Sequence, residues 1–184
     1  MKLNRTVIFL FLAVTTVIAG CKLQDKWDKM LGDLPKPKNE ITINQIVKYP
    51  RARKIERQIE TFSGRTIWIN INSFIHSNVI RKIELIPNKK RSGFYDLKLF
   101  MNRRGRLRWM QLSTGFKNEP LAFVIDGIFY RSFIPKPMVG DYDNDANTTY
   151  VVIEGPFDKG TAEALVKSAP TNFTYFNDNE DDEF

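Results

Sequence analysis

The sequence predicts an α+β fold, in which a mixed, mainly antiparallel sheet carries two short helices packed on one face. Three observations lead to this prediction. Residues 54–72 hold two alternating strand patterns that meet at the turn signal Ser63-Gly64. Asp126-Gly127 separates two apolar runs, as a two-residue type I′ hairpin turn does. A helical pattern over 159–168 follows a group of strands, and this order is typical of α+β proteins.

The remaining elements follow from the spacing of apolar residues. The other expected strands are 79–86, 95–101, 121–125, 128–133 and 150–153. Residues 106–114 repeat apolar side chains three and four positions apart, which favours a short helix. Gly155-Pro156 is expected to break the strand before it, and Asp158 to cap the helix at 159–168. We expect Pro170 to end that helix and residues 171–176 to form a last strand.

The N-terminus has the three parts of an export signal. Lys2 and Arg5 are positive, residues 7–18 are mostly apolar, and small residues stand at 19–20. The apolar run of 12 residues is shorter than the about 20 that a transmembrane helix needs. The sequence therefore predicts a cleaved signal peptide over residues 1–20, with an uncleaved membrane anchor as the alternative.

The sequence Ile18-Ala19-Gly20-Cys21 resembles the bacterial lipobox, an aliphatic residue and two small residues before a cysteine. The resemblance implies cleavage between Gly20 and Cys21, a diacylglycerol on the thiol, and acylation of the new amine, for example with palmitate. Two or more acyl chains anchor a protein stably, because each buried methylene contributes about 0.8 kcal/mol. Cys21 is the only cysteine, so no intramolecular disulfide is expected, and a free thiol is the alternative.

The chain is basic, with a formal net charge of +7. Such a body attracts anionic surfaces such as phospholipid headgroups, although charges that only keep the surface solvated are the alternative. Export argues against nucleic acid as a partner. An amphipathic stretch follows Cys21 and ends at Pro35, and it suits a membrane surface, packing on the folded part, or disorder equally.

Candidate chemical sites are few. His76 is the only histidine, and no nucleophile motif accompanies it, so a structural role is expected. Asp141, Asp143 and Asp145 have the spacing of calcium ligands, but the glycine and glutamate that an EF-hand requires are missing. This loop is only a weak metal candidate, and no cofactor is expected. Asp126-Gly127 is expected to be a structural turn, in which Asp126→Asn would be nearly neutral.

An ordered set of motifs runs through residues 95–176. It comprises a strand, a turn ending in glycine, a helix, an apolar strand ending in Asp-Gly, a second strand before a proline, a strand of the form apolar-x-Ile-x-Gly, and a helix rich in alanine and leucine. The corresponding residues are 95–101, Gly105, 107–114, 121–127, Pro135, 151–155 and 162–166. The set resembles the head of the first periplasmic domain of SecD, the accessory subunit of the protein-export machinery.

The SecD resemblance implies a fold and a tendency to handle polypeptides in the periplasm, and it brings no catalytic residue. SecD also has transmembrane helices, which this chain lacks after residue 20, so a proton-driven export motor is not expected. The expected organisation is a signal peptide, a lipidated tether, an N-terminal β-rich subdomain, a SecD-head-like α+β domain and an acidic tail, over 1–20, 21–40, 41–94, 95–176 and 177–184.

The predicted function is that of a membrane-anchored cell-envelope lipoprotein with a non-enzymatic module that binds protein or another envelope component, in a role accessory to export or envelope assembly. The alternatives are an envelope hydrolase and a structural lipoprotein that links envelope layers. If the host has two membranes, Lys22 after the lipidated cysteine favours the outer membrane, with the protein facing the periplasm.

Overall fold

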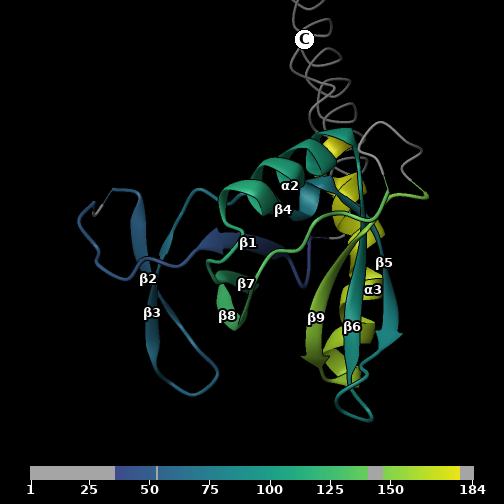
Figure 1. Ribbon diagram of the computed structural model, residues 1–184, viewed down its shortest axis with the longest axis horizontal. Coiled ribbons are helices and arrows are strands. Elements are labelled where there is room, and N and C mark those ends of the chain that lie inside the picture. Colours follow the sequence, from purple (N-terminus) through teal and green to yellow (C-terminus); the bar gives the residue numbers. More distant parts are fainter. Residues whose placement is uncertain (1–35, 53, 141–146, 179–184) are drawn as a thin grey trace, which may run out of the picture. The chain divides into compact units, whose positions relative to one another are not determined.

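The computed structural model describes residues 36–52, 54–140 and 147–178, which belong to one compact unit that begins at Lys36 (Figure 1). The elements of this unit are β1 (Ile41–Gln45), β2 (Glu56–Glu60), β3 (Thr66–Asn70), β4 (Ile75–His76), η1 (Ser77–Val79), β5 (Ile80–Pro87), β6 (Tyr95–Met101), α2 (Arg103–Gly115), β7 (Leu121–Ile125), β8 (Ile128–Phe133), β9 (Val151–Phe157) and α3 (Lys159–Asp178). No helix in this part of the chain is long and apolar enough to cross a membrane.

Strand β7 is buried on both of its faces. It lies inside an antiparallel sheet of order β4-β1-β7-β8, and none of its five residues is more than 9% exposed. Leu121, Phe123 and Ile125 face the main core, whereas Ala122 and Val124 face a second, smaller core. A strand that is covered on both faces is apolar throughout rather than alternating. This explains why residues 121–125 carry no polar side chain.

The β2–β3 hairpin covers the second face of β7. Ile46, directly after β1, bridges Ile69 of β3, and Thr61, directly after β2, bridges Phe129 of β8. Strands β3, β1, β7, β8 and β2 thereby close into a ring, since β2 and β3 also pair with each other. The ring encloses the second core, to which the hairpin contributes Ile59 and Ile69. Closure also gives hydrogen-bonding partners to strand edges that would otherwise be open.

A separate antiparallel sheet, of order β5-β6-β9, packs one face on the main core. Helix α3 contacts β5 and β6, and Ala162, Leu165 and Ala169 of α3 are buried in that core (Figure 1). Helix α2 adds Trp109, which is fully buried and whose Nε1 donates to the Lys136 carbonyl oxygen at 2.9 Å. Both helices therefore contribute to the same core.

The expected α+β class is confirmed, because the strands form antiparallel sheets beside two helices. The strands form three sheets rather than one, and α3 has 20 residues, so it is not short. Two sheets each contain strands from both sides of the subdomain boundary expected after residue 94: β1 pairs with β7, and β5 pairs with β6. Helix α2 begins earlier than expected because the Asn102 side chain caps it, accepting the Gly105 N–H at 2.8 Å.

The expected strand break at Gly155-Pro156 is wrong. Strand β9 continues to Phe157, with a register shift against β6 between Tyr95 and Leu97. Gly155 permits this close approach: a Cβ atom there would lie 2.1 Å from the Tyr95 carbonyl oxygen. The Gly155 N–H donates to the Asp96 carboxylate at 2.6 Å, so the backbone stays paired through the irregular step.

The expected helix end at Pro170 and the expected strand at 171–176 are also wrong, because α3 runs on to Asp178. A proline removes one helical hydrogen bond and usually ends a helix. Tertiary contacts hold the residues that follow it. The Asn172 side chain exchanges hydrogen bonds with the Lys38 backbone, at 3.2 and 2.8 Å, and Asn177 Nδ2 donates to the Asn78 carbonyl oxygen at 2.8 Å.

We predict that Gly155→Ala destabilises the fold by about 2 kcal/mol or more, because the new methyl group forces β9 away from β6. Gly115→Ala is the matched control, since a Cβ at that helical position meets no atom within 4 Å. The control is expected to be neutral or slightly stabilising. Urea unfolding of the full chain measures both, and equal midpoints for the two variants would contradict the close approach at Gly155.

Candidate binding site

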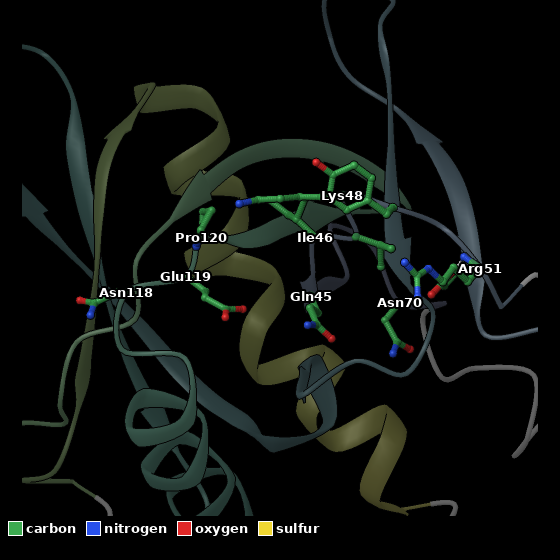
Figure 2. Close-up of a pocket in the computed structure, with 11 residues that line it drawn as sticks. Gln45, Ile46, Lys48, Arg51, Asn70, Asn118, Glu119 and Pro120 are labelled. Atoms are coloured by element: carbon green, nitrogen blue, oxygen red, sulfur yellow. Dashed lines mark hydrogen bonds between the residues drawn. The ribbon is translucent and has the colours of Figure 1, made fainter.

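A pocket of about 470 Å³ opens where β1 ends and β7 begins, beside the hairpin. Its walls come from residues 45–51, from β2 and β3, and from the turn at 118–120 that precedes β7. In Figure 2, Asn118 and Asn70 lie on opposite sides of the opening, with Gln45 between them. Three side-chain amides from distant parts of the chain therefore meet at one pocket.

The ring of strands positions these side chains. Gln45 is the last β1 residue paired with β7, opposite Leu121. The chain then turns toward β3, where the Val47 N–H donates to the Trp68 carbonyl oxygen at 2.8 Å. Asn44 is buried and its Nδ2 donates to the Asn70 carbonyl oxygen at 2.9 Å, which ties the end of β3 to β1. The pocket is thus the rim of the ring.

The pocket carries charges of both signs, but one of its carboxylates already has a structural role. Glu56 accepts the backbone N–H groups of Arg51 and Ala52, at 2.7 and 2.9 Å, and so shapes the loop before β2. Glu119, Lys48 and the Arg51 side chain remain at the pocket wall. Tyr49 is 80% exposed at the edge of the pocket. The pocket therefore offers hydrogen-bond donors, acceptors and an aromatic ring.

A second pocket of about 360 Å³ lies next to the first. It is lined by Ser73, Phe74, Arg108, Gln111, Leu112 and Phe116. Asn70 of the first pocket and Ser73 of the second are three positions apart in the chain, and Asn118 and Phe116 are two positions apart. Such short chain segments keep the two pockets close together in space. The second contains two aromatic rings, those of Phe74 and Phe116, at 4.9 Å between centroids. We call the two pockets together the groove, with a polar part and an aromatic part.

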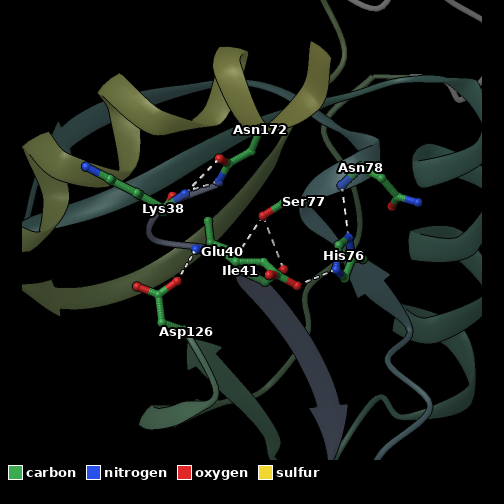
Figure 3. Close-up of polar contacts among 8 residues, drawn as sticks. All are labelled: Lys38, Glu40, Ile41, His76, Ser77, Asn78, Asp126 and Asn172. Atoms are coloured by element: carbon green, nitrogen blue, oxygen red, sulfur yellow. Dashed lines mark hydrogen bonds and ion pairs between the residues drawn. The ribbon is translucent and has the colours of Figure 1, made fainter. Parts of the chain in front are cut away.

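A separate polar cluster holds the first residues of the unit (Figure 3). Asn172 of α3 binds the Lys38 backbone, and the Asp126 carboxylate accepts the N–H groups of Asn39 and Glu40 at 3.2 and 2.7 Å. The Asp126 N–H donates to the Glu40 carbonyl oxygen at 2.9 Å. Residues 38–40 are therefore bound to a helix and to a hairpin turn before β1 begins.

His76 belongs to the same cluster. Its Nε2 lies 2.5 Å from Glu40 Oε1, and its ring packs edge-on against Phe176 at 4.7 Å between centroids. The Ser77 hydroxyl accepts the Ile41 N–H at 2.7 Å. These contacts hold the His76 ring in place and agree with the structural role expected for it.

The structure places Asp126 and Gly127 at the turn between β7 and β8, with φ of 49° and 80°. The turn was expected, but the bonds from Asp126 to residues 39 and 40 were not. Those partners are 86 and 87 positions away, and no local pattern reveals such a contact. Gly20, Cys21 and the weak metal candidate, Asp141, Asp143 and Asp145, lie outside the described residues. The described residues contain no group of three or more possible metal ligands.

The pKa of Asp158 is lowered, and hydrogen bonds within the fold explain this shift. Its carboxylate accepts the Thr161 N–H and the Tyr130 hydroxyl, each at 2.9 Å. These hydrogen bonds, that of Thr161 first, lower the pKa of Asp158, and burial raises the pKa of Tyr130. A carboxylate with a lowered pKa stabilises the folded state at neutral pH, and this stabilisation is lost as the pH falls through that pKa. We therefore assign Asp158 to the start of α3, as expected.

We predict that Asp126→Asn lowers the free energy of unfolding by about 1–2 kcal/mol instead of being neutral. The turn tolerates asparagine, but one accepting oxygen becomes an amide N–H that faces a backbone N–H. Glu163→Gln is the control, because among the described residues its carboxylate makes one ion pair, an exposed one with Lys159 at 3.8 Å. Chemical denaturation at neutral pH compares them, and an equal effect of the two substitutions would show that the Asp126 contacts contribute nothing.

No family model matches the sequence, and no curated protein matches it significantly. Three solved structures are similar. A membrane component, SecDF, that enhances protein export has 11% identity and a TM-score of 0.49, covering 80% of this chain and 69% of that one. SecDF in a super-membrane-facing form has 11% identity and a TM-score of 0.50, covering 80% and 21%. SecDF, a translocon-associated membrane protein from Thermus thermophilus, has 9% identity and a TM-score of 0.38, covering 74% and 29%.

The TM-score of 0.50 shows a fold shared with part of the super-membrane-facing SecDF. The chain spans about a fifth of the length of the super-membrane-facing SecDF chain. The similarity agrees, at the level of the fold, with the SecD resemblance in the sequence.

Proposed function

We propose that the chain is a membrane-anchored lipoprotein of the bacterial cell envelope, and that its folded part is a non-enzymatic module that binds polypeptide. The observation that supports this most is the groove, in which a polar pocket and an aromatic pocket lie next to each other. A polypeptide presents the same two kinds of group side by side, a polar backbone and apolar side chains.

The polar part of the groove suits a peptide backbone. Gln45, Asn70 and Asn118 carry side-chain amides, which both donate and accept hydrogen bonds, as peptide groups do. Tyr49 adds a large ring with little conformational freedom to lose, a property that favours contact with varied side chains. The charges of Lys48 and Glu119 have opposite signs, so the pocket is not specialised for a polyanion.

The groove gives less support to a hydrolase. Acyl transfer needs a nucleophile beside a base, and glycoside hydrolysis needs two available carboxyl groups. Ser73 lines the aromatic part, but the chain's only histidine, His76, is bound to Glu40. Of the two carboxylates at the polar part, Glu56 is occupied by backbone N–H groups, which leaves Glu119 alone.

The fold shared with SecDF supports a role accessory to protein export or envelope assembly, because one similar SecDF structure is that of a component that enhances protein export. Fold similarity supports such a role only by analogy. The anchor in this proposal is the lipid on Cys21, after cleavage behind Gly20. In a host with two membranes, Lys22 favours the outer membrane, with the module in the periplasm.

We predict that Cys21→Ala abolishes lipidation and membrane retention, because it removes the thiol and leaves the apolar run over 7–18 unchanged. Metabolic labelling with a fatty-acid analogue and membrane fractionation measure the two effects. Lys22→Ala is the control and should still be labelled. Undiminished labelling of the Cys21→Ala protein would exclude the proposed anchor.

We predict that the full chain binds short unstructured peptides and that Tyr49→Ala weakens this binding by roughly 1 kcal/mol, about fivefold in Kd. Tyr49 is 80% exposed, so its removal should leave the fold intact. Lys167→Ala, an exposed change on α3, is the control. Fluorescence anisotropy with labelled peptides gives the Kd values. The proposal fails if no peptide binds, or if the two substitutions have the same effect.

A further inference from the structure

We propose that the aromatic part of the groove receives the C-terminal residue of a polypeptide, with its apolar side chain packed against the paired rings of Phe74 and Phe116 and its carboxylate on Arg108. This inference rests on the proposed function, since it names the end of the polypeptide that the groove selects. It depends on an apolar pocket and a cation that lie one helical turn apart.

The pocket has an apolar floor that the fold holds in place. Leu112 is only 2% exposed, because it packs into the main core from α2. The Phe116 N–H donates to the Leu112 carbonyl oxygen at 2.9 Å, and the Phe74 N–H donates to the Ile43 carbonyl oxygen at 2.8 Å. The backbones of both residues are therefore anchored, one to α2 and the other to β1, and their rings pack against the main core and against each other. A preformed apolar pocket with few polar groups is the usual form of a ligand site.

Arg108 stands at the pocket wall four positions before Leu112, so the two side chains lie on the same side of α2. It is exposed and makes no hydrogen bond or ion pair with any residue that the structure describes. Helix α2 carries four arginines and no acidic residue, so nothing in the helix neutralises this charge. A guanidinium binds a carboxylate through two parallel hydrogen bonds. The ligand group that complements this wall is a carboxylate.

The short separation between cation and apolar floor favours a terminal residue over an internal one. Neighbouring side chains of an extended peptide point in opposite directions, so an internal acid and the apolar residue beside it cannot both enter one pocket. A C-terminal residue carries its side chain and its carboxylate on the same Cα. The two groups then lie about as far apart as Arg108 and Leu112, which are one helical turn apart.

The polar part of the groove favours a polypeptide over a fatty acid. The residues before the C-terminus would reach the Asn118 amide, which can donate and accept, and the Nδ2 of Asn70, whose Oδ1 already accepts the Asn72 N–H at 2.9 Å. A fatty acid would also present a carboxylate and an apolar chain, but it would leave those amides without a ligand partner. The two pockets together therefore match a chain that has a polar backbone behind its last residue.

Calorimetric titration of the full chain with three peptides of one sequence tests the proposal. The peptides end in phenylalanine with a free carboxylate, in phenylalanine amide, and in serine with a free carboxylate. We expect the first to bind about tenfold more tightly than either of the others, because each of them lacks one of the two recognised groups. Arg108→Gln should remove the difference between acid and amide, and Arg108→Lys should keep part of it. Lys167→Gln, on exposed α3, is the matched control and should keep all of it.

Equal binding of the acid and the amide by the unmodified chain would overturn this inference and leave the proposed function standing. Persistence of the difference in Arg108→Gln would also overturn it, and an unchanged thermal unfolding midpoint would show that this variant is folded. Absence of binding by all three peptides would instead remove the proposed function. Laurate serves as the lipid probe: if it binds in an Arg108-dependent manner and the peptides do not, the occupant is an acyl chain and the proposal fails.

Discussion

The burial of β7 on both faces is the constraint on which the rest of the fold depends. Each fully buried aliphatic or aromatic side chain contributes about 1.5–3 kcal/mol, and β7 has such side chains on both faces. One face is covered by the main core, with its two helices, and the other by the β2–β3 hairpin. The hairpin must fold back along β1 and β8 to cover this face, and the ring of strands is the result. The polar part of the groove is the rim of that ring.

The contacts around residues 38–41 matter for any model of a tethered protein. They connect the first residues of the unit to α3, to the β7–β8 turn and to β4, which come from three distant parts of the chain. Strand β1 then enters the sheet beside β7. If the chain is anchored through its N-terminus, as we propose, a force on the tether acts on this network before it reaches the core.

Fold similarity and site chemistry contribute differently to the functional interpretation. The super-membrane-facing SecDF structure shares a fold with the chain at 11% sequence identity, and such similarity does not transfer a partner or a site. The groove is described by this chain's own residues, including the Arg108 side chain and the amides of Asn70 and Asn118. A polypeptide ligand is therefore proposed from these side chains, and the export role only from the shared fold.

The sequence by itself determined the elements that depend on local chemistry. Turn residues at Ser63-Gly64 and Asp126-Gly127 predict both hairpins, because left-handed backbone conformations need few and recognisable residue types. Apolar spacing likewise predicts α2, although the Asn102 cap moves its start. The short export signal and Cys21 remain sequence-based predictions, since they lie outside the described residues.

Only the tertiary structure decided the rest. A proline usually ends a helix, yet α3 continues past Pro170 because Asn172 and Asn177 bind the carbonyl oxygens of Lys38 and Asn78, which are far away in the sequence. Gly155 remains within β9 because another strand approaches it closely. The groove likewise depends on residues from β1, β3, α2 and the turn before β7, and no spacing along the chain reveals that they meet. Such contacts are non-local, so local propensity cannot encode them.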